Sequence, residues 1–258
     1  MDLYFDVGVI GNYHSNSQKA RLLTENWLLK NMYCPRCGNL NVEQFENNRP
    51  VADFFCPSCK NEYELKSKEG NLGDKINDGA YEKMIERITS NQNPDFFFMS
   101  YSKTEYLVKN LILIPKHFFV PSVIEKRKPL SNTARRAGWV GCNIVIDRIP
   151  EQGRISVISN GRIIDAGQVM GKLSISNRLN TQDLVGRNWI MDVLNCVNKI
   201  PAQIFSLQDM YSFEQELQYK HPENHNIKPK IRQQLQLLRD KGFIEFLGNG
   251  NYVKSVQA

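Results

Sequence analysis

The sequence lacks any apolar run that approaches the roughly 20 residues needed to cross a bilayer. The short run LILI at residues 111–114 is typical of a buried strand instead. The first residues, MDLYFDVGVI, carry Asp2 and Asp6 where a signal peptide carries positive charge, and they contain no apolar export segment. These absences predict a cytoplasmic protein with no membrane partner.

Internal repeats, low-complexity tracts and a strong net charge are also missing. Of the 258 residues, 41% are hydrophobic and 10% aromatic, which is typical of a folded protein and excludes general disorder. The formal charge is only +6, but residues 126–148 carry six basic residues against one acid, and residues 224–236 carry three against none. Two basic stretches predict a polyanion contacted in two places, although solvated surface explains the same charges.

Cysteine is scarce, but its spacing is informative. Four of the six cysteines form two C-x2-C pairs separated by 18 residues: Cys34, Cys37, Cys56 and Cys59. This spacing predicts a four-thiolate zinc site that leaves no position open for water and is therefore structural. Cys142 and Cys196 stand alone and are predicted to be small buried hydrophobes. The four histidines form no spaced pair, so no histidine metal site is predicted.

Hydrophobic periodicity predicts a mixed α/β domain over residues 1–182. Helices are expected at residues 15–34, with Ser17 as a possible cap, and at residues 77–90. Strands are expected at residues 51–55, 62–67, 95–101 and 106–114, and Asn160-Gly161 predicts a hairpin turn. A second domain, residues 183–258, has expected helices at 187–199, 207–220 and 227–241 followed by a hairpin. Three helices and a hairpin is the order of a winged helix, whose third helix reads DNA.

The segment VADFFCPSCKNEYELKSK at residues 51–68 raises the question of catalysis. If its two strands pair antiparallel about the second cysteine pair, Asp53 faces Glu64, and Lys66 shares their side of the sheet. Directly opposed acids are destabilising, and a divalent cation such as Mg²⁺ would turn the repulsion into a site. A solvated hairpin with ordinary charges is the alternative. Glu25 on the first helix could add a ligand, but the sequence favours an exposed position on the helix surface.

Pro50-x2-Asp53 followed by Glu64-Leu65-Lys66 resembles the PD-(D/E)xK nuclease motif, with the Pro displaced from its usual place beside the Asp. The blocks SNSQKAR, FENNRPVADF, ELKSK, INDGAY, TARRAGW and KIRQQLQ extend the likeness over nearly the whole chain. The sequence as a whole resembles the DpnI family of methyl-directed (type IIM) GATC restriction endonucleases. That resemblance implies a restriction-endonuclease-like mixed sheet flanked by helices, with a four-cysteine zinc knuckle, followed by a winged-helix domain.

The resemblance also implies a type II endonuclease that hydrolyses double-stranded DNA at N6-methylated adenines, in the site G-m6A-T-C, and leaves 5′-phosphates. Asp53, Glu64 and Lys66 would be catalytic, and Asp53, Glu64 and Leu65 would hold Mg²⁺. Both domains would read the methylated site, and the enzyme would be a monomer. The residues expected to contact DNA are Arg135, Arg136, Trp139, Lys228, Lys230, Arg232, Gln233 and Gln234. From the sequence alone, Trp139 would be placed in the core.

Two other interpretations fit parts of the sequence. A non-catalytic, zinc-stabilised winged-helix regulator would explain the basic stretches and the cysteines, but it has no need of Asp53, Glu64 and Lys66 on one face. A nuclease with a different target is the second, because the residues alone do not specify a base sequence.

Overall fold

The structure is a computed structural model that describes residues 1–11, 13–46, 52–90, 93–181 and 183–255. A seven-stranded mixed sheet lies at its centre, in the order β1-β2-β3-β5-β6-β9-β10. Its strands are β1 Glu43–Gln44, β2 Phe54–Phe55, β3 Glu62–Glu69, β5 Asp95–Ser102, β6 Leu107–Ile114, β9 Ile155–Ser159 and β10 Arg162–Ile163. Neighbouring strands are antiparallel except β3 and β5, which run parallel.

The parallel pair needs a crossover connection, which β4 (Lys75–Ala80) and α2 (Tyr81–Thr89) supply. The helix expected from residue 77 was predicted too long, because Asn77 and Asp78 pair with β8 as strand residues. The helix itself begins at Tyr81 and buries Met84 and Ile88. The crossover therefore carries the chain from one edge of a second, smaller sheet back over the central one.

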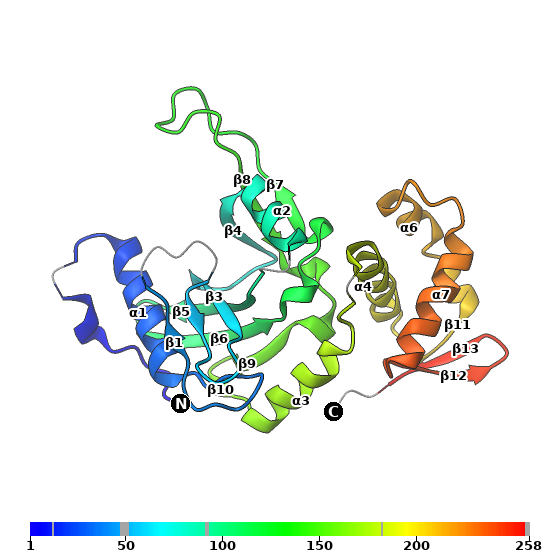
Figure 1. Ribbon diagram of the computed structural model, residues 1–258, viewed down its shortest axis with the longest axis horizontal. Coiled ribbons are helices and arrows are strands. Elements are labelled where there is room, and N and C mark those ends of the chain that lie inside the picture. Colours follow the sequence, from blue (N-terminus) through cyan, green and yellow to red (C-terminus); the bar gives the residue numbers. More distant parts are fainter. Residues whose placement is uncertain (12, 47–51, 91–92, 182, 256–258) are drawn as a thin grey trace.

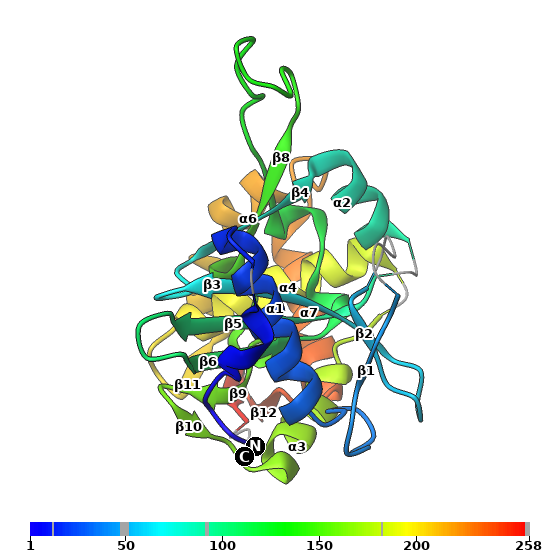
Figure 2. The ribbon, with the colours of Figure 1, turned by 90° about the vertical axis from the view of Figure 1, so that its left-hand side faces the viewer.

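Two cores lie on opposite faces of the central sheet, because successive residues of the fully buried strand β5 point to alternate sides. Phe97 packs with α1 (Asn16–Asn31) and α3 (Ala166–Asn177), and Phe98 packs with the crossover. Figure 2 shows α1 in front of the sheet. Ser15 rather than Ser17 is the N-cap residue of α1, and α3 was not predicted.

The second sheet has the order β4-β8-β7, with β7 at Ile124–Lys126 and β8 at Gly141–Val145. The segment between β7 and β8, residues 127–140, projects from the body of the molecule in two perpendicular views (Figures 1 and 2). We call this segment the projecting hairpin. Short 3₁₀ turns occur at Val7–Ile10, Lys116–Phe118, Pro121–Val123, Ile146–Arg148 and Glu151–Gly153.

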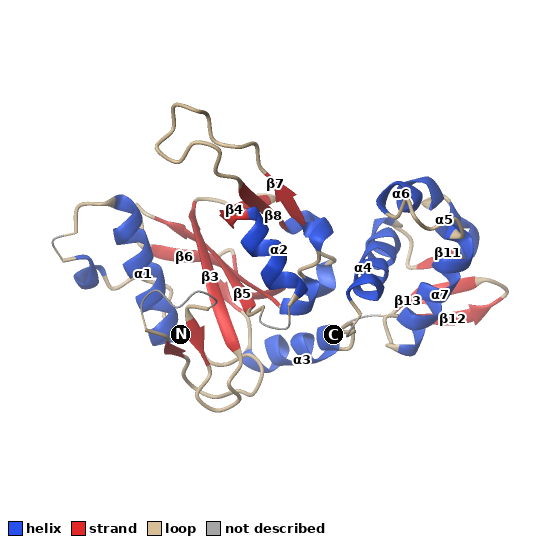
Figure 3. Cartoon of the chain, turned by 45° about the horizontal axis from the view of Figure 1, so that its top comes forward, coloured by secondary structure: helices blue, strands red, loops and turns tan. Residues whose placement is uncertain are grey.

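The C-terminal part is a winged helix, as predicted (Figure 3). Its elements are α4 Leu184–Lys199, β11 Ile204–Ser206, α5 Leu207–Tyr211, α6 Glu214–Lys220, α7 Ile227–Asp240, β12 Ile244–Gly248 and β13 Asn251–Lys254. The helix expected at residues 207–220 is two short helices, and the unpredicted strand β11 joins the wing in the order β11-β13-β12. The order of helices and wing nevertheless follows the sequence pattern.

Helix α4 joins the winged helix to the rest of the chain. Its residues Leu194 and Val197 belong to the same buried cluster as Phe118 and Ile149. Polar contacts reinforce the junction, for example the hydrogen bond of 2.6 Å that Ser122 Oγ donates to Asn188 Oδ1. One continuous core therefore connects the central sheet to the winged helix.

Candidate active site and nucleic-acid interface

The four cysteines of the two C-x2-C pairs come together in one cluster. The sulfur atoms of Cys34, Cys37, Cys56 and Cys59 all lie within 4.8 Å of one another. The distance is 3.6 Å from Cys34 to Cys59 and also from Cys37 to Cys56. Four sulfurs bound about 2.3 Å from a tetrahedral ion would be roughly 3.8 Å apart. The cluster is therefore compatible with a structural zinc ion.

Both cysteine pairs adopt the same tight turn. The N–H of Gly38 donates to the carbonyl of Cys34 at 2.9 Å, and the N–H of Lys60 donates to that of Cys56 at 3.0 Å. Gly38 and Lys60 both have positive φ, of 76° and 60°. Lysine adopts this conformation at a cost that glycine avoids. The shared geometry indicates that the two turns act as one module.

Asp95 connects this module to the central sheet. Its side chain is fully buried at the start of β5, and it accepts two bonds from the Arg36 guanidinium, at 3.1 and 3.3 Å. Asn61, in the turn after Cys56, donates to the same carboxylate at 2.8 Å, and so does the N–H of Lys116. The carboxylate thus contacts both cysteine turns, so it holds the module against β3 and β5.

The register predicted for the hairpin that contains the second cysteine pair is confirmed. Phe54 pairs with Tyr63 and Phe55 with Glu62, and the strands are antiparallel. Phe54 and Tyr63 are fully buried, on the face predicted to enter the core. The alternation of residues along the strand then turns the acidic side to the opposite face.

Asp53 lies against the strand that carries the other two residues of the motif. Its carboxylate Oδ2 accepts the N–H of Leu65 at 2.9 Å, so it meets the main chain between Glu64 and Lys66. Pro50 of the motif lies outside the described residues. The structure thus brings the aspartate to the segment Glu64-Leu65-Lys66.

Glu64 and Lys66 belong to a mostly buried cluster of ion pairs. Lys66 Nζ lies 2.6 Å from Glu64 Oε1 and 2.5 Å from Asp78 Oδ1. Arg87 Nη1 lies 2.7 Å from Glu64 Oε2. Burial lowers the pKa of Lys66, but the charges of Glu64 and Asp78 outweigh it and raise the pKa above its ordinary value. Burial raises the pKa of Glu64, against the opposing effect of Lys66 and Arg87.

The second carboxylate oxygen of Glu64 is held by an ion pair. Within the described residues, no hydrogen bond satisfies the buried atom Oε2 of Glu64, although Arg87 faces it as an ion-pair partner. The Asp53 carboxylate accepts the N–H of Leu65, the residue after Glu64, and two carboxylates from one hairpin are ligands that a hard cation accepts. The donor set therefore fits a divalent metal.

Asp78 and Arg87 were missed by the sequence reasoning. They come from β4 and α2, the crossover between β3 and β5. The available signal was topological, because a crossover must pass over one face of the sheet. That face is the one that carries Glu64 and Lys66.

Glu25 faces the same edge of the sheet from α1. Its carboxylate accepts bonds from Arg21 Nε at 2.6 Å and from Gln44 Nε2 at 2.9 Å. The hydrogen bond that Arg21 donates to Glu25 raises the pKa of Arg21, and the charge of Asp53 adds to this shift. Arg21 therefore provides a half-exposed cation close to Asp53, with Glu25 as its partner.

The projecting hairpin carries three of the residues expected to contact DNA. Arg135 and Arg136 are exposed near its tip, and Trp139 is only partly buried near its base. The guanidinium of Arg136 lies over the Trp139 ring, 4.8 Å from its centroid. The core position that the sequence alone favoured for Trp139 is wrong. The two cations are exposed to solvent and the aromatic ring is only partly covered, all on one segment.

Helix α7 carries the remaining predicted contacts. Lys228, Arg232 and Gln233 are exposed and Lys230 is partly so. Gln234 is 1% exposed and points into the core, so the prediction that it contacts DNA is wrong. Gln234 lies on the apolar face of the helix, whereas the other four side chains are spread over its exposed side; we call these four residues the polar row.

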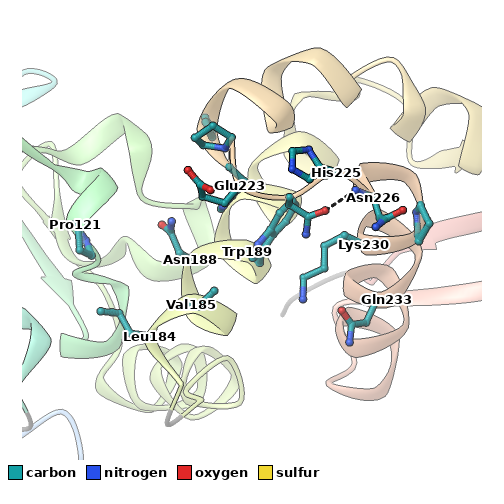
Figure 4. A pocket seen from close by; sticks show the side chains of 15 residues that line it. Pro121, Leu184, Val185, Asn188, Trp189, Glu223, His225, Asn226, Lys230 and Gln233 are labelled. Atoms are coloured by element: carbon teal, nitrogen blue, oxygen red, sulfur yellow. Dashed lines mark hydrogen bonds between the residues drawn. The ribbon is translucent and has the colours of Figure 1, made fainter.

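An open cavity of about 1070 Å³ lies beside this row, between α4 and α7 (Figure 4). Lys230 and Gln233 line it, with Pro121 from the preceding part of the chain. The Trp189 ring at its wall stacks on His221 at 3.7 Å, and Lys230 Nζ is 5.7 Å from that ring. Polar groups of α7 thus face an accessible hollow next to the helix.

Two family models match the chain. The model of the DpnI, Dam-replacing family matches residues 1–182, and that of the Dam-replacing HTH domain matches residues 186–254. The first match alone covers more than half of the 258 residues. Within the described part of the chain, every helix is too short or too polar to span a bilayer.

Proposed function

Because the chain belongs to the DpnI, Dam-replacing family of type II methylation-dependent restriction endonucleases, we propose which DNA it cuts and with which residues. The substrate is double-stranded DNA methylated at N6 of adenine, in the site G-m6A-T-C. The reaction is Mg²⁺-dependent hydrolysis of phosphodiester bonds that leaves 5′-phosphates. One observation carries the catalytic part of this proposal: the Asp53 carboxylate accepts the N–H of Leu65, between Glu64 and Lys66. A protein that only binds DNA does not need that arrangement. Membership of the family supports the methylated substrate. In this proposal the enzyme acts in the cytoplasm, where it meets its DNA substrate.

Asp53, Glu64 and Lys66 form the catalytic set in this proposal. Asp53 and Glu64, with the main chain of Leu65, would hold a magnesium ion, which would stabilise charge on the phosphoryl oxygens. The Lys66 ammonium, beside these acids, donates to the attacking water or to a phosphoryl oxygen and stabilises the charge that develops there. Water attacks the phosphorus in line, and the 3′ oxygen leaves.

The cysteine module supports this site from one side. The turn that carries Cys56 joins β2 to β3, and a zinc ion bound by the four cysteines would tie that turn to the first pair. Asp53 and Glu64 lie on either side of the same turn, so a bound zinc ion would fix their relative position. Preorganisation of this kind is what a catalytic pair requires.

Two parts of the chain read the methylated site in this proposal. Residues 1–182 form the catalytic domain, which uses Arg135, Arg136 and Trp139 of the projecting hairpin. Residues 183–258 form the winged helix, which uses the exposed row of α7, namely Lys228, Lys230, Arg232 and Gln233. Each methyl group contributes about 1–3 kcal/mol of apolar contact, so two readers multiply a modest preference. The active unit is a monomer.

Cleavage of plasmid DNA from adenine-methylating and non-methylating hosts tests the proposal. We expect discrete fragments from methylated DNA with Mg²⁺, and none with a chelator or from unmethylated DNA. Asp53→Asn should abolish cutting but retain DNA binding, because it keeps an acceptor for Leu65 and removes the charge. Glu43→Gln, on the exposed neighbouring strand β1, is the matched control and should cut normally. Cutting by Asp53→Asn would refute the catalytic set, and cutting of both plasmids would refute the methyl readers.

A further inference from the structure

Lys66 contacts two carboxylates, and only one of them belongs to the motif. Glu64 follows from the sequence, whereas Asp78 comes from the second sheet. All four side chains of the cluster are mostly buried, with exposures of 21% for Lys66, 11% for Glu64, 9% for Asp78 and 17% for Arg87. A buried ammonium needs a carboxylate partner, because loss of its only partner leaves an uncompensated charge.

The carboxylates of Glu64 and Asp78 have different roles if Glu64 binds a divalent cation. The cation would then compete with Lys66 for the Glu64 carboxylate and would repel the ammonium. Asp78 is the other carboxylate in contact with Lys66 among the described residues, and it lies outside the Asp53–Glu64 pair. We propose that Asp78 positions Lys66 during catalysis. This proposal rests on the catalytic set proposed above.

The backbone around Asp78 fixes its carboxylate in place. The N–H of Gly79 donates to the same Oδ1 atom that contacts Lys66, at 2.7 Å. The strand has a bulge between Asp78 and Ala80, and Asp78 pairs with Cys142 of β8. Bulges commonly re-aim a side chain next to an active site. The carboxylate is therefore oriented by its own strand and does not depend on Lys66 for its position.

Arg87 completes the arrangement from α2. Its Nη1 atom pairs with Glu64, and its Nη2 atom lies 4.0 Å from Asp78 Oδ2. When Glu64 turns to a metal, Asp78 is the acid that remains beside both cations. Asp78 thus holds Lys66 within reach of the scissile phosphate in the state that cleaves DNA.

Single-turnover cleavage of a methylated duplex by Asp78→Asn and Asp78→Glu tests the proposal. We expect Asp78→Asn to lower the cleavage rate constant roughly 10- to 100-fold, as outer-sphere partners of an active site do. DNA affinity, measured with Ca²⁺ in place of Mg²⁺, should not fall, because Asp78 is not on a proposed DNA-binding surface and its negative charge does not attract the phosphate. Asp78→Glu keeps the charge and should recover part of the rate. Glu82→Gln, exposed on α2, is the control and should cleave at the wild-type rate.

Thermal melting without metal and with Ca²⁺ supplies a readout that does not depend on cleavage. Asp78→Asn should lower the melting temperature in the wild-type background. In a Lys66→Met background the same change should have no effect or raise it, since Asp78 has then lost its closest partner. A role limited to the Gly79 turn would instead lower the melting temperature equally in both backgrounds and in both buffers.

The outcomes separate this proposal from the one on which it rests. If Asp53→Asn still cleaves DNA, the catalytic set itself is wrong. If Asp53→Asn is inactive and Asp78→Asn cleaves at the wild-type rate, only the positioning role is wrong. Equal rates for Asp78→Asn and Asp78→Glu would also overturn it, because the carboxylate charge would then be irrelevant.

Discussion

The contact between Asp95 and the cysteine module makes a quantitative prediction about how the module supports the sheet. Asp95→Asn replaces one carboxylate oxygen by an amide that cannot accept from Arg36 or Asn61. The Arg36 guanidinium, 29% exposed, loses its anionic partner, and a buried donor is left without an acceptor. Breaking a buried ion pair by removing one partner costs about 3–5 kcal/mol. For a chain of this size the melting temperature should fall by about 10 °C.

Thermal unfolding followed by circular dichroism, together with a zinc assay, checks this prediction. The zinc content should not change, because the four sulfur ligands are untouched. Asp6→Asn, which removes an exposed acid paired with Lys30, is the control and should hardly alter the melting temperature. A double variant, Asp95→Asn with Arg36→Leu, should regain part of the loss, because it leaves no unpaired charge.

Two results would refute this reasoning. If Asp95→Asn melts within about 2 °C of the wild type, Arg36 finds water as an adequate substitute and the contact is not a clamp. If the double variant melts no higher than the single one, the loss of stability comes from the hydrogen bonds that Asn61 and Lys116 donate to Asp95, and not from the ion pair.

Three further predictions follow from single side chains. Cys56→Ser should lose bound zinc, whereas Cys196→Ser, buried away from the cluster, should retain it; zinc in the first variant would contradict the assignment. His117 is buried and burial lowers its pKa to about 4 from 6.5, so only the unfolded chain binds this proton between those values. The free energy of unfolding should therefore fall by about 3 kcal/mol from pH 7 to pH 4 on account of this group, and urea titrations of His117→Gln should show that much less pH dependence. Gly161 has φ of 72°, so Gly161→Ala should lower stability by about 1–2 kcal/mol, and an unchanged urea midpoint would contradict this.

Local patterns in the sequence were sufficient for much of the fold. The Asn160-Gly161 pair predicted a hairpin because both residues accept positive φ, and the structure has 48° and 72° there. The register of the Phe54–Tyr63 pair followed from side chains that alternate between the faces of a strand. Spacing of two residues within each cysteine pair predicted the cluster, since ligands of one ion must lie in one turn.

Non-local contacts explain what the sequence analysis missed. Residues 77–80 have a composition that is disfavoured in strands, and only pairing with β8 makes them a strand. Asp78 and Lys66 are 12 residues apart in the chain and meet only because a crossover covers the sheet. Gln234 is a different failure, because its spacing from Ile231 and Leu238 places it on the buried face of α7. The glutamine side chain is typical of a DNA contact, but its position on the helix determines that it is buried.

The charges of the proposed active site argue that metal and DNA bind there together. Asp53, Glu64 and Asp78 bring three negative charges, and Lys66 and Arg87 bring two positive ones, mostly out of water. The site alone therefore has a net charge of −1, and a bound divalent ion would change this net charge to +1. A single phosphodiester supplies the missing negative charge, so each ligand makes the site more favourable for the other, and linkage requires the effect to be reciprocal. Asp78 contributes one of these negative charges, and without it the site would be neutral before any ligand arrives and would attract a metal ion less strongly.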